Sequence, residues 1–219
     1  MLQLQLAETT AAAPTVLAIG SHADDIEIGC GGTLLKLASL YSGLVVHWVV
    51  LGCAEEERAR EAERSARSLL DGAAELSVTL GRFPDAFFPY SGGDVKRFFE
   101  ELKGKLSPQL IFTHYREDLH QDHRLACELT WNTFRDHLIL EYEVPKYDGD
   151  LGAPNVFVHL DTDVSERKIA HLLEHFPSQA GKRWFTDDLF RALHRLRGME
   201  SNSATGLAEA FYCRKLVLS

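Results

Sequence analysis

Residues 16–32 read VLAIGSHADDIEIGCGG: a short apolar run that ends on a glycine, then one histidine, two adjacent aspartates and a glycine-rich segment. The apolar run over residues 16–20 predicts a buried parallel strand. The glycines predict a turn, and the apolar spacing after them predicts a helix over residues 31–42. The stretch therefore predicts a strand, a loop that carries a histidine and two carboxylates, and a helix.

The same alternation of strands and helices continues along the chain. Further strands are predicted near residues 44–51, 76–80, 109–113, 138–144, 156–160 and 211–218. Helices are predicted near residues 55–70, 94–106, 124–137, 164–175 and 187–197. This rhythm predicts an α/β, Rossmann-like fold: an open, mostly parallel sheet with helices on both faces. We expect one domain over residues 14–219, preceded by a flexible arm over residues 1–13.

Composition excludes several classes of function. The net charge of -9, with no basic cluster, argues against a nucleic-acid partner. The four cysteines include no CxxC pair, which excludes a zinc finger and favours reduced thiols. No segment has the pattern of a signal peptide or the length of a membrane span. We therefore expect a soluble, cytoplasmic protein.

A second acid-and-histidine segment, THYREDLHQDHR, occupies residues 113–124 and also follows an apolar strand. Ligands of such sheets bind beyond the carboxyl ends of the strands, so both segments are expected at one edge. His22 and Asp25 lie three residues apart in a turn, as do His120 and His123 at the start of a helix. Catalytic zinc commonly takes three such ligands and leaves a position for water. The two segments therefore predict a metal site, with a carboxylate and a histidine left over for acid–base chemistry.

Each segment has a simpler interpretation when taken alone. Two aspartates before glycines are more often a turn and a helix cap than a catalytic pair. The segment GCGG is also compatible with a weak phosphate-binding loop. It is not the GxGxxG pattern of dinucleotide folds, and no acidic residue ends the second predicted strand. The pair of segments on one edge favours the metal site over these alternatives.

SHADDIEIGCGGTL, at residues 21–34, resembles the "(P/A)HPDDE…GGTL" opening of the LmbE-like, or PIG-L, N-acetylglucosaminyl deacetylases. HQDH, at residues 120–123, resembles their second motif, "HPDH". Weaker similarities, ERAREAERSARSLL, SQAGK, RLRG and AEAF, extend the resemblance over most of the chain from Thr15 onward. The resemblance implies an LmbE-like fold and a zinc-dependent hydrolase. Its substrate would be an N-acetylated amino sugar of the N-acetylglucosamine type, or a conjugate of one, and it would remove the acetyl group.

The resemblance also implies roles for individual residues. The zinc ligands would be His22, Asp25 and His123, although another divalent ion is possible. Asp24 would be the general base, and His120 would stabilise the oxyanion or protonate the leaving amine. Asp122 would orient a histidine. Arg58 is the best match for a substrate-contacting arginine, with Arg60 as its rival.

Four positions depart from the family pattern. Ala23 and Gln121 replace prolines, which removes backbone restriction but no chemical group. Ser21 replaces the common proline or alanine, and Ile26 replaces the common glutamate. Glu27 is a partial substitute for that glutamate. None of these changes removes a predicted metal ligand or Asp24.

Other parts of the chain are less specific. His114 either borders the site or has a structural role. The aromatic residues Phe83, Phe87, Phe88 and Tyr90 form a sugar pocket, a core, or a mixture of both, and we favour the mixture. Tyr147, Asp148 and Asp150 are candidates for a lid.

Two alternative functions remain from sequence alone. One is a metal-dependent amidase that acts on a bulkier sugar–thiol or peptide-like conjugate. The other is a non-catalytic module that binds a sugar or a nucleotide. The expected partner under the favoured interpretation is a small acetylated amino sugar, and a homo-oligomer is possible.

Overall fold

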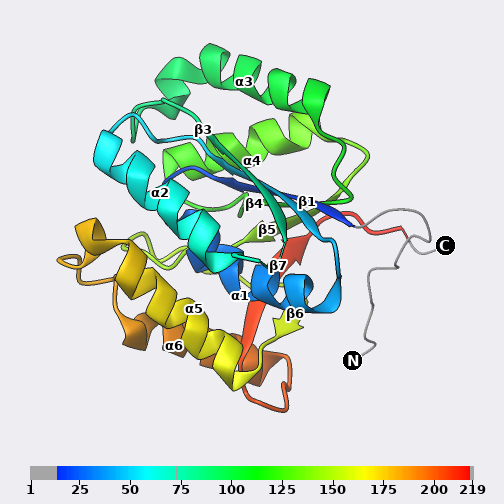
Figure 1. The fold of residues 1–219 in the computed structure, drawn as a ribbon, viewed down its shortest axis with the longest axis vertical. Helices are drawn as coiled ribbons and strands as arrows, with labels where there is room; N and C mark the ends of the chain where they lie inside the picture. Colours follow the sequence, from blue (N-terminus) through cyan, green and yellow to red (C-terminus); the bar gives the residue numbers. More distant parts are fainter. Residues whose placement is uncertain (1–13, 73, 218–219) are drawn as a thin grey trace.

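A seven-stranded sheet crosses the middle of the computed structural model, which describes residues 14–72 and 74–217 (Figure 1). The strands are β1 (Thr15–Gly20), β2 (Val45–Val50), β3 (Glu75–Leu80), β4 (Leu110–His114), β5 (Leu138–Tyr142), β6 (Val156–His159) and β7 (Ala208–Cys213). Their order in the sheet is β3-β2-β1-β4-β5-β7-β6. β1 to β5 pair in parallel, whereas β7 runs antiparallel to both β5 and β6. The predicted mostly parallel sheet is confirmed, and the predicted arm over residues 1–13 lies outside the described residues.

Helices cover both faces of this sheet. They are α1 (Asp25–Leu40), α2 (Glu56–Leu69), α3 (Gly92–Lys105), α4 (Gln121–Thr133), α5 (Thr162–His175) and α6 (Asp187–Glu200). Alternate residues of β1 serve opposite faces, as the two-residue period of a strand requires. Leu17 and Ile19 belong to the core beneath α3 and α4, whereas Val16 and Ala18 belong to the core shared with α1, α2, α5 and α6. Figure 1 shows α3 and α4 on one side of the sheet and α5 and α6 on the other.

The strand order reverses between β1 and β4. From β1 the chain proceeds outward to β2 and β3, and it then returns to place β4 on the other side of β1. The loops that follow β1 and β4 therefore leave the same edge of the sheet side by side. An open α/β sheet binds its ligands at such a point, where neighbouring loops diverge.

The first helix begins earlier than predicted, at Asp25 rather than at residue 31. Its glycines lie inside the helix, where the packing around Gly29 and Gly32 leaves no room for a side chain. A Cβ atom on Gly29 would lie 2.1 Å from the Tyr142 ring, and one on Gly32 would lie 3.0 Å from Glu209. The predicted glycine turn was therefore wrong, and GCGG is not a phosphate-binding loop.

Two other boundaries also differ from prediction. α4 begins at Gln121, three residues before the predicted start, so the second motif is part of the helix rather than a loop before it. The last strand is centred earlier, at Ala208–Cys213. All four cysteines are free thiols. None of the helices in the described part of the chain is long and apolar enough to cross a membrane.

Candidate metal centre

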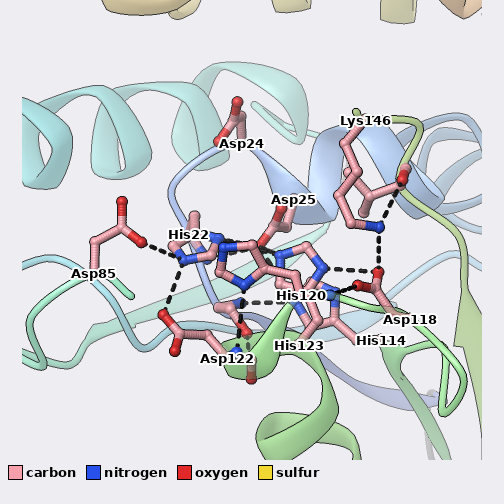
Figure 2. Close-up of polar contacts among 12 residues, drawn as sticks. His22, Asp24, Asp25, Asp85, His114, Asp118, His120, Asp122, His123 and Lys146 are labelled. Carbon is pink, nitrogen blue, oxygen red and sulfur yellow. Dashed lines mark hydrogen bonds and ion pairs between the residues drawn. The ribbon is translucent and has the colours of Figure 1, made fainter. Parts of the chain in front are cut away.

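The two predicted segments meet at the edge of the sheet where β1 and β4 end (Figure 2). His22 and Asp24 lie in the short loop after β1, and Asp25 is the first residue of α1. His114 is the last residue of β4, His120 caps the N-terminus of α4, and His123 lies in its first turn. Residues about 100 positions apart in the chain thus come into contact because β1 and β4 are neighbours.

Three donor atoms form a triangle at the centre of this cluster. His22 Nδ1 lies 3.2 Å from His123 Nε2 and 3.3 Å from Asp25 Oδ2. His123 Nε2 lies 3.5 Å from the same oxygen of Asp25. Zinc with bonds of about 2.0–2.2 Å requires its tetrahedral ligands to be about 3.3–3.6 Å apart. The three predicted ligands therefore have the spacing that such an ion needs.

The outer nitrogen of each of these histidines faces a carboxylate. His123 Nδ1 is 2.8 Å from Asp118 Oδ2, and His22 Nε2 is 2.9 Å from Asp85 and 3.3 Å from Asp122. Such carboxylates hold a histidine in the tautomer and ring orientation that a metal requires. Asp122 was expected to orient a histidine, and the ring it contacts is His22 of the first segment.

The charges of the three predicted ligands differ. Burial opposes protonation of His22, but Asp25, Asp122 and Asp85 raise its pKa well above the usual value, so a metal would have to displace its proton. Burial opposes ionisation of Asp25, but His123, His114 and His22 around it hold its pKa well below the usual value. Burial, together with the neighbouring His114, lowers the pKa of His123 to about 3. Asp25 is thus a carboxylate and His123 a neutral imidazole at neutral pH, which are the states that bind a divalent ion.

Asp24 is placed differently from Asp25. Its Oδ1 accepts a hydrogen bond of 2.6 Å from Arg58, while its Oδ2 is buried and has no hydrogen-bond partner among the described residues. The side chain is turned toward α2 and away from the triangle (Figure 2). Burial raises the pKa of Asp24, and the positive charge of Arg58 opposes this. A buried carboxylate oxygen without a partner is an unmet acceptor, which a water molecule or a substrate group would satisfy.

The two candidate arginines on α2 have separate environments. Arg58 contacts Asp24, and its other terminal nitrogen donates to Glu61 at 2.5 Å and to Ser178 at 3.0 Å. Arg60 is 72% exposed and pairs with Glu56 on the surface. The structure therefore brings Arg58 to the site and leaves Arg60 outside it.

His120 lies beside the triangle. One of its ring nitrogens is within 4.8 Å of donor atoms of His22 and His123. Its Nδ1 accepts the backbone N–H of Asp122, so Nε2 carries the proton and can donate. Burial, reinforced by the nearby His22, lowers the pKa of His120, so the ring is neutral at pH 7. A neutral donor next to the metal-type ligands fits the role predicted for His120.

His114 lies within the centre. The sequence alone did not decide whether this histidine borders the site or has a structural role. It is fully buried, its ring stacks on that of His123 at 3.8 Å, and its Nε2 lies 3.2 Å from Asp25 Oδ2. The same nitrogen accepts the backbone N–H of Ser21 at 2.9 Å. His114 thus ties the first loop to the end of β4, beneath the three ligands.

Sequence reasoning missed Asp85, Asp118 and Glu61. Asp118 had a usable signal, since it precedes His120 by two residues in the second motif. Asp85 had none, because only folding brings it near His22. Glu61 had a local signal, since it lies three residues after Arg58 on the same helix. Of the aromatic stretch, Phe88 is fully buried in the core, whereas Phe87 and Tyr90 are 55% and 84% exposed, and the sugar pocket stays a prediction.

Known proteins resemble this chain in sequence and in structure. The model of the PIG-L family, described as GlcNAc-PI de-N-acetylase, matches residues 17–134, more than half of the 219. YaiS of Escherichia coli (strain K12), described as an uncharacterised deacetylase, is 28% identical over 171 residues, which cover 73% of this chain and 89% of YaiS.

Two solved structures show the same fold. A conserved protein from Thermus thermophilus superposes with a TM-score of 0.73 at 23% identity, over 93% of this chain and 96% of that one. The N,N'-diacetylchitobiose deacetylase of Pyrococcus horikoshii superposes with a TM-score of 0.67 at 22% identity, over 92% of this chain and 84% of that one.

Proposed function

This chain belongs to the PIG-L family of deacetylases, and from that premise we propose that it is a metal-dependent hydrolase of N-acetylated amino sugars or their conjugates. It would cleave the amide bond and release acetate and a free amine. The observation that carries the proposal is the triangle of His22, Asp25 and His123, whose donor atoms are 3.2–3.5 Å apart. Zinc is the ion we expect there, since one carboxylate and two imidazoles are common ligands of catalytic zinc.

A divalent ion at this position would lower the pKa of a water molecule from about 15.7 to roughly 7 and polarise the amide carbonyl. The remaining steps belong to the side chains. Asp24 takes the proton of the attacking water on its unpartnered Oδ2. Arg58 holds the other oxygen of Asp24 and so keeps the carboxylate in one orientation.

His120 acts on the other side of the reacting carbonyl. Its Nε2–H is free to donate a hydrogen bond to the oxygen as negative charge develops on it. The nitrogen of the breaking amide bond then receives a proton and leaves as the amine. Asp24, which holds the proton taken from the water, is the donor we assign to this step, and the neutral His120 keeps its Nε2–H and serves the oxyanion, one of the two roles expected of it.

Names of relatives support an acetamido sugar as the substrate. The family description names GlcNAc-PI, and one structural neighbour is a deacetylase of N,N'-diacetylchitobiose; both names specify an N-acetyl group on a sugar. Around the proposed site, Asp85 is 70% exposed at the side chain and lies against His22, on the opposite side of the cluster from Lys146 (Figure 2). We propose that Asp85 and Arg58 bind hydroxyl groups of the sugar.

An acetate-release assay tests this function. The zinc-loaded protein is incubated with N-acetylglucosamine, N,N'-diacetylchitobiose and N-acetylglucosaminyl conjugates, and with peptide-like amides of larger acyl groups. We expect acetate from at least one acetamido sugar and none with Asp24→Asn at equal zinc content. Hydrolysis of the larger amides alone would favour the bulkier-conjugate amidase. A zinc-loaded protein that hydrolyses nothing in the panel would favour a binding module.

A further inference from the structure

The loop between β5 and β6, residues 143–155, contains a buried lysine that the proposed chemistry does not use. Lys146 Nζ donates to Asp118 Oδ2 at 2.9 Å and to Asp150 Oδ2 at 2.5 Å. The side chains of Lys146, Asp118 and Asp150 are 9%, 2% and 5% exposed. Burying three charges is costly unless they are held in good geometry, so this triad is a fixed part of the fold.

Asp118 connects this triad to the metal centre. Its Oδ2, the oxygen that accepts from Lys146, also lies 2.8 Å from His123 Nδ1. Its Oδ1 accepts the backbone N–H of His120 at 2.8 Å. Asp150 adds a second connection, because its Oδ2 accepts the backbone N–H of Leu119. The loop is therefore bound to the segment just before α4 at two adjacent residues.

The two proposed histidine ligands, His22 and His123, each have an aspartate beside the ring, and different groups hold the two aspartates in place. Asp122, behind His22, accepts backbone N–H groups from Ala86 and Phe88. Asp118, behind His123, takes the Lys146 ammonium on the oxygen that faces the ring. The orientation of His123 therefore depends on a side chain from a separate loop, as Figure 2 shows for Lys146, Asp118 and His123.

We propose that Lys146 is a positioning residue of the metal centre, which fixes Asp118 and through it the ring of His123. Without the ammonium, the carboxylates of Asp118 and Asp150 would face each other with no positive charge between them and repel. Asp118 would then turn away from His123 Nδ1, and the ring would lose the contact that aims Nε2 at the ion. The inference rests on the metal site of the proposed function and is independent of the substrate.

The test measures zinc affinity by competition with a chelator. We expect Lys146→Met to weaken zinc binding about 10-fold or more, the lower end of the effect of removing a partner of a metal-bound histidine. Lys146→Arg, which keeps the charge, should restore much of the loss. Lys36→Met is the matched control: the side chain of Lys36 bonds only the carbonyl of His159 among the described residues, on β6. Its zinc affinity should equal that of the parent.

Two further readouts separate positioning from a structural role. Saturating zinc raises the free energy of unfolding of the folded protein. If the zinc affinity is 10-fold weaker, this gain is smaller by about 1.4 kcal/mol. The absorption spectrum of the cobalt(II)-loaded variant should also differ from that of the parent, since it reports ligand geometry. A lower melting temperature of the chelated protein, with zinc affinity and cobalt spectrum unchanged, would overturn the proposal.

The controls also keep the two proposals apart. A parent protein that binds no stoichiometric divalent ion would contradict the proposed function itself. A parent that binds zinc, with Lys146→Met binding it equally well, would contradict only the role of Lys146. If Lys146→Met does not fold, Asp150→Asn removes one anchor of the lysine and keeps its charge. That variant should weaken zinc binding in the same direction, and unchanged binding would again overturn the inference.

Discussion

Asp24 and Asp25 are neighbours in the chain, yet their surroundings give them opposite properties. Asp25 starts α1 and points into three imidazole rings, which hold its pKa well below the usual value despite burial. Asp24 precedes the helix and turns toward α2, where burial raises its pKa against the pull of Arg58. One residue step at a helix start thus separates the proposed ion ligand from the proposed proton acceptor.

The first prediction separates these roles by substitution. His22→Ala should lose stoichiometric zinc, because it removes one corner of the triangle. Asp24→Asn should retain zinc and lower turnover about 10²–10⁴-fold, the usual contribution of a general base. Metal analysis after dialysis and acetate release measure the two effects.

A control histidine makes the comparison specific. His159 is on β6, away from the cluster, so His159→Ala should change neither zinc content nor turnover. Loss of zinc from Asp24→Asn would contradict the assignment of that residue as a base.

At the scale of elements, α1 carries Asp25 of the centre at its first residue, and its Gly29 packs closely against the ring of Tyr142. Tyr142 is fully buried against Gly29, and its hydroxyl donates to the carbonyl of Ile19 at 2.6 Å. The ring is therefore held from both ends and has no space to move away. Gly31, two residues along, has only ordinary contacts, the nearest at 3.7 Å.

The second prediction uses this contrast. Gly29→Ala should lower the free energy of unfolding by about 1–3 kcal/mol, the typical cost of forcing extra volume into a packed core. Gly31→Ala should be neutral or raise it by up to about 1 kcal/mol, since alanine is the better helix former. Urea denaturation in the presence of a chelator measures both. Equal effects of the two substitutions would show that packing against Tyr142 is not the cause.

α1 is also fixed by an ion pair from two distant elements. Lys168 on α5 pairs with Glu209 on β7 at 2.6 Å and donates to the carbonyl of Ile28. Glu209 accepts the backbone N–H groups of Gly32 and Thr33. In a regular helix the carbonyl of Ile28 accepts a hydrogen bond from the N–H of Gly32. The ion pair therefore contacts both groups of one backbone hydrogen bond of α1.

The third prediction tests this buried pair. Glu209→Gln leaves Lys168 buried without its counter-charge and should lower the free energy of unfolding by about 3–5 kcal/mol. The matched control is Glu166→Gln, which breaks an ion pair with Arg191. The side chains of Glu166 and Arg191 are 49% and 39% exposed. That change should cost less than about 1 kcal/mol. Similar costs in thermal unfolding would contradict a special role for the buried pair.

For the whole molecule, acid stability depends in part on histidines packed between helices. His194 on α6 is buried and bonds to Ser165 on α5 at 2.8 Å. Burial, reinforced by the charge of Lys168, lowers the pKa of His194 to about 2. The unfolded chain takes up this proton near pH 6.5 and the folded chain does not. The free energy of unfolding contributed by this group therefore falls as the pH is lowered below 6.5.

The fourth prediction isolates this group. Between pH 6 and 4, His194→Gln should reduce the slope of unfolding free energy against pH by about 1.4 kcal/mol per pH unit relative to the parent. Urea denaturation of metal-free protein at several pH values measures the slopes. The comparison of slopes is independent of any constant loss of stability in the variant. Parallel curves for variant and parent would contradict a neutral, buried His194.

The sequence by itself determined the architecture and the identity of the central residues. Strand and helix periods predict the parallel sheet, and two motifs after β1 and β4 predict a shared edge. Both signals are local: each depends on residues within one strand, one helix or one loop. Spacing within the motifs pointed to His22, Asp25 and one of the pair His120 and His123, and the resemblance to the LmbE-like family selected His123.

Only the tertiary structure decided which residues support that centre. Lys146 reaches Asp118 from the loop after β5, and Ser178 contacts Arg58 from the short helix Pro177–Gln179. Gly29 and Gly32 of α1 show the same limit, because the atoms that crowd them belong to Tyr142, Leu160 and Glu209, more than 100 positions away. Contacts between distant segments depend on how the elements pack, and no periodicity or motif in this one sequence records that packing.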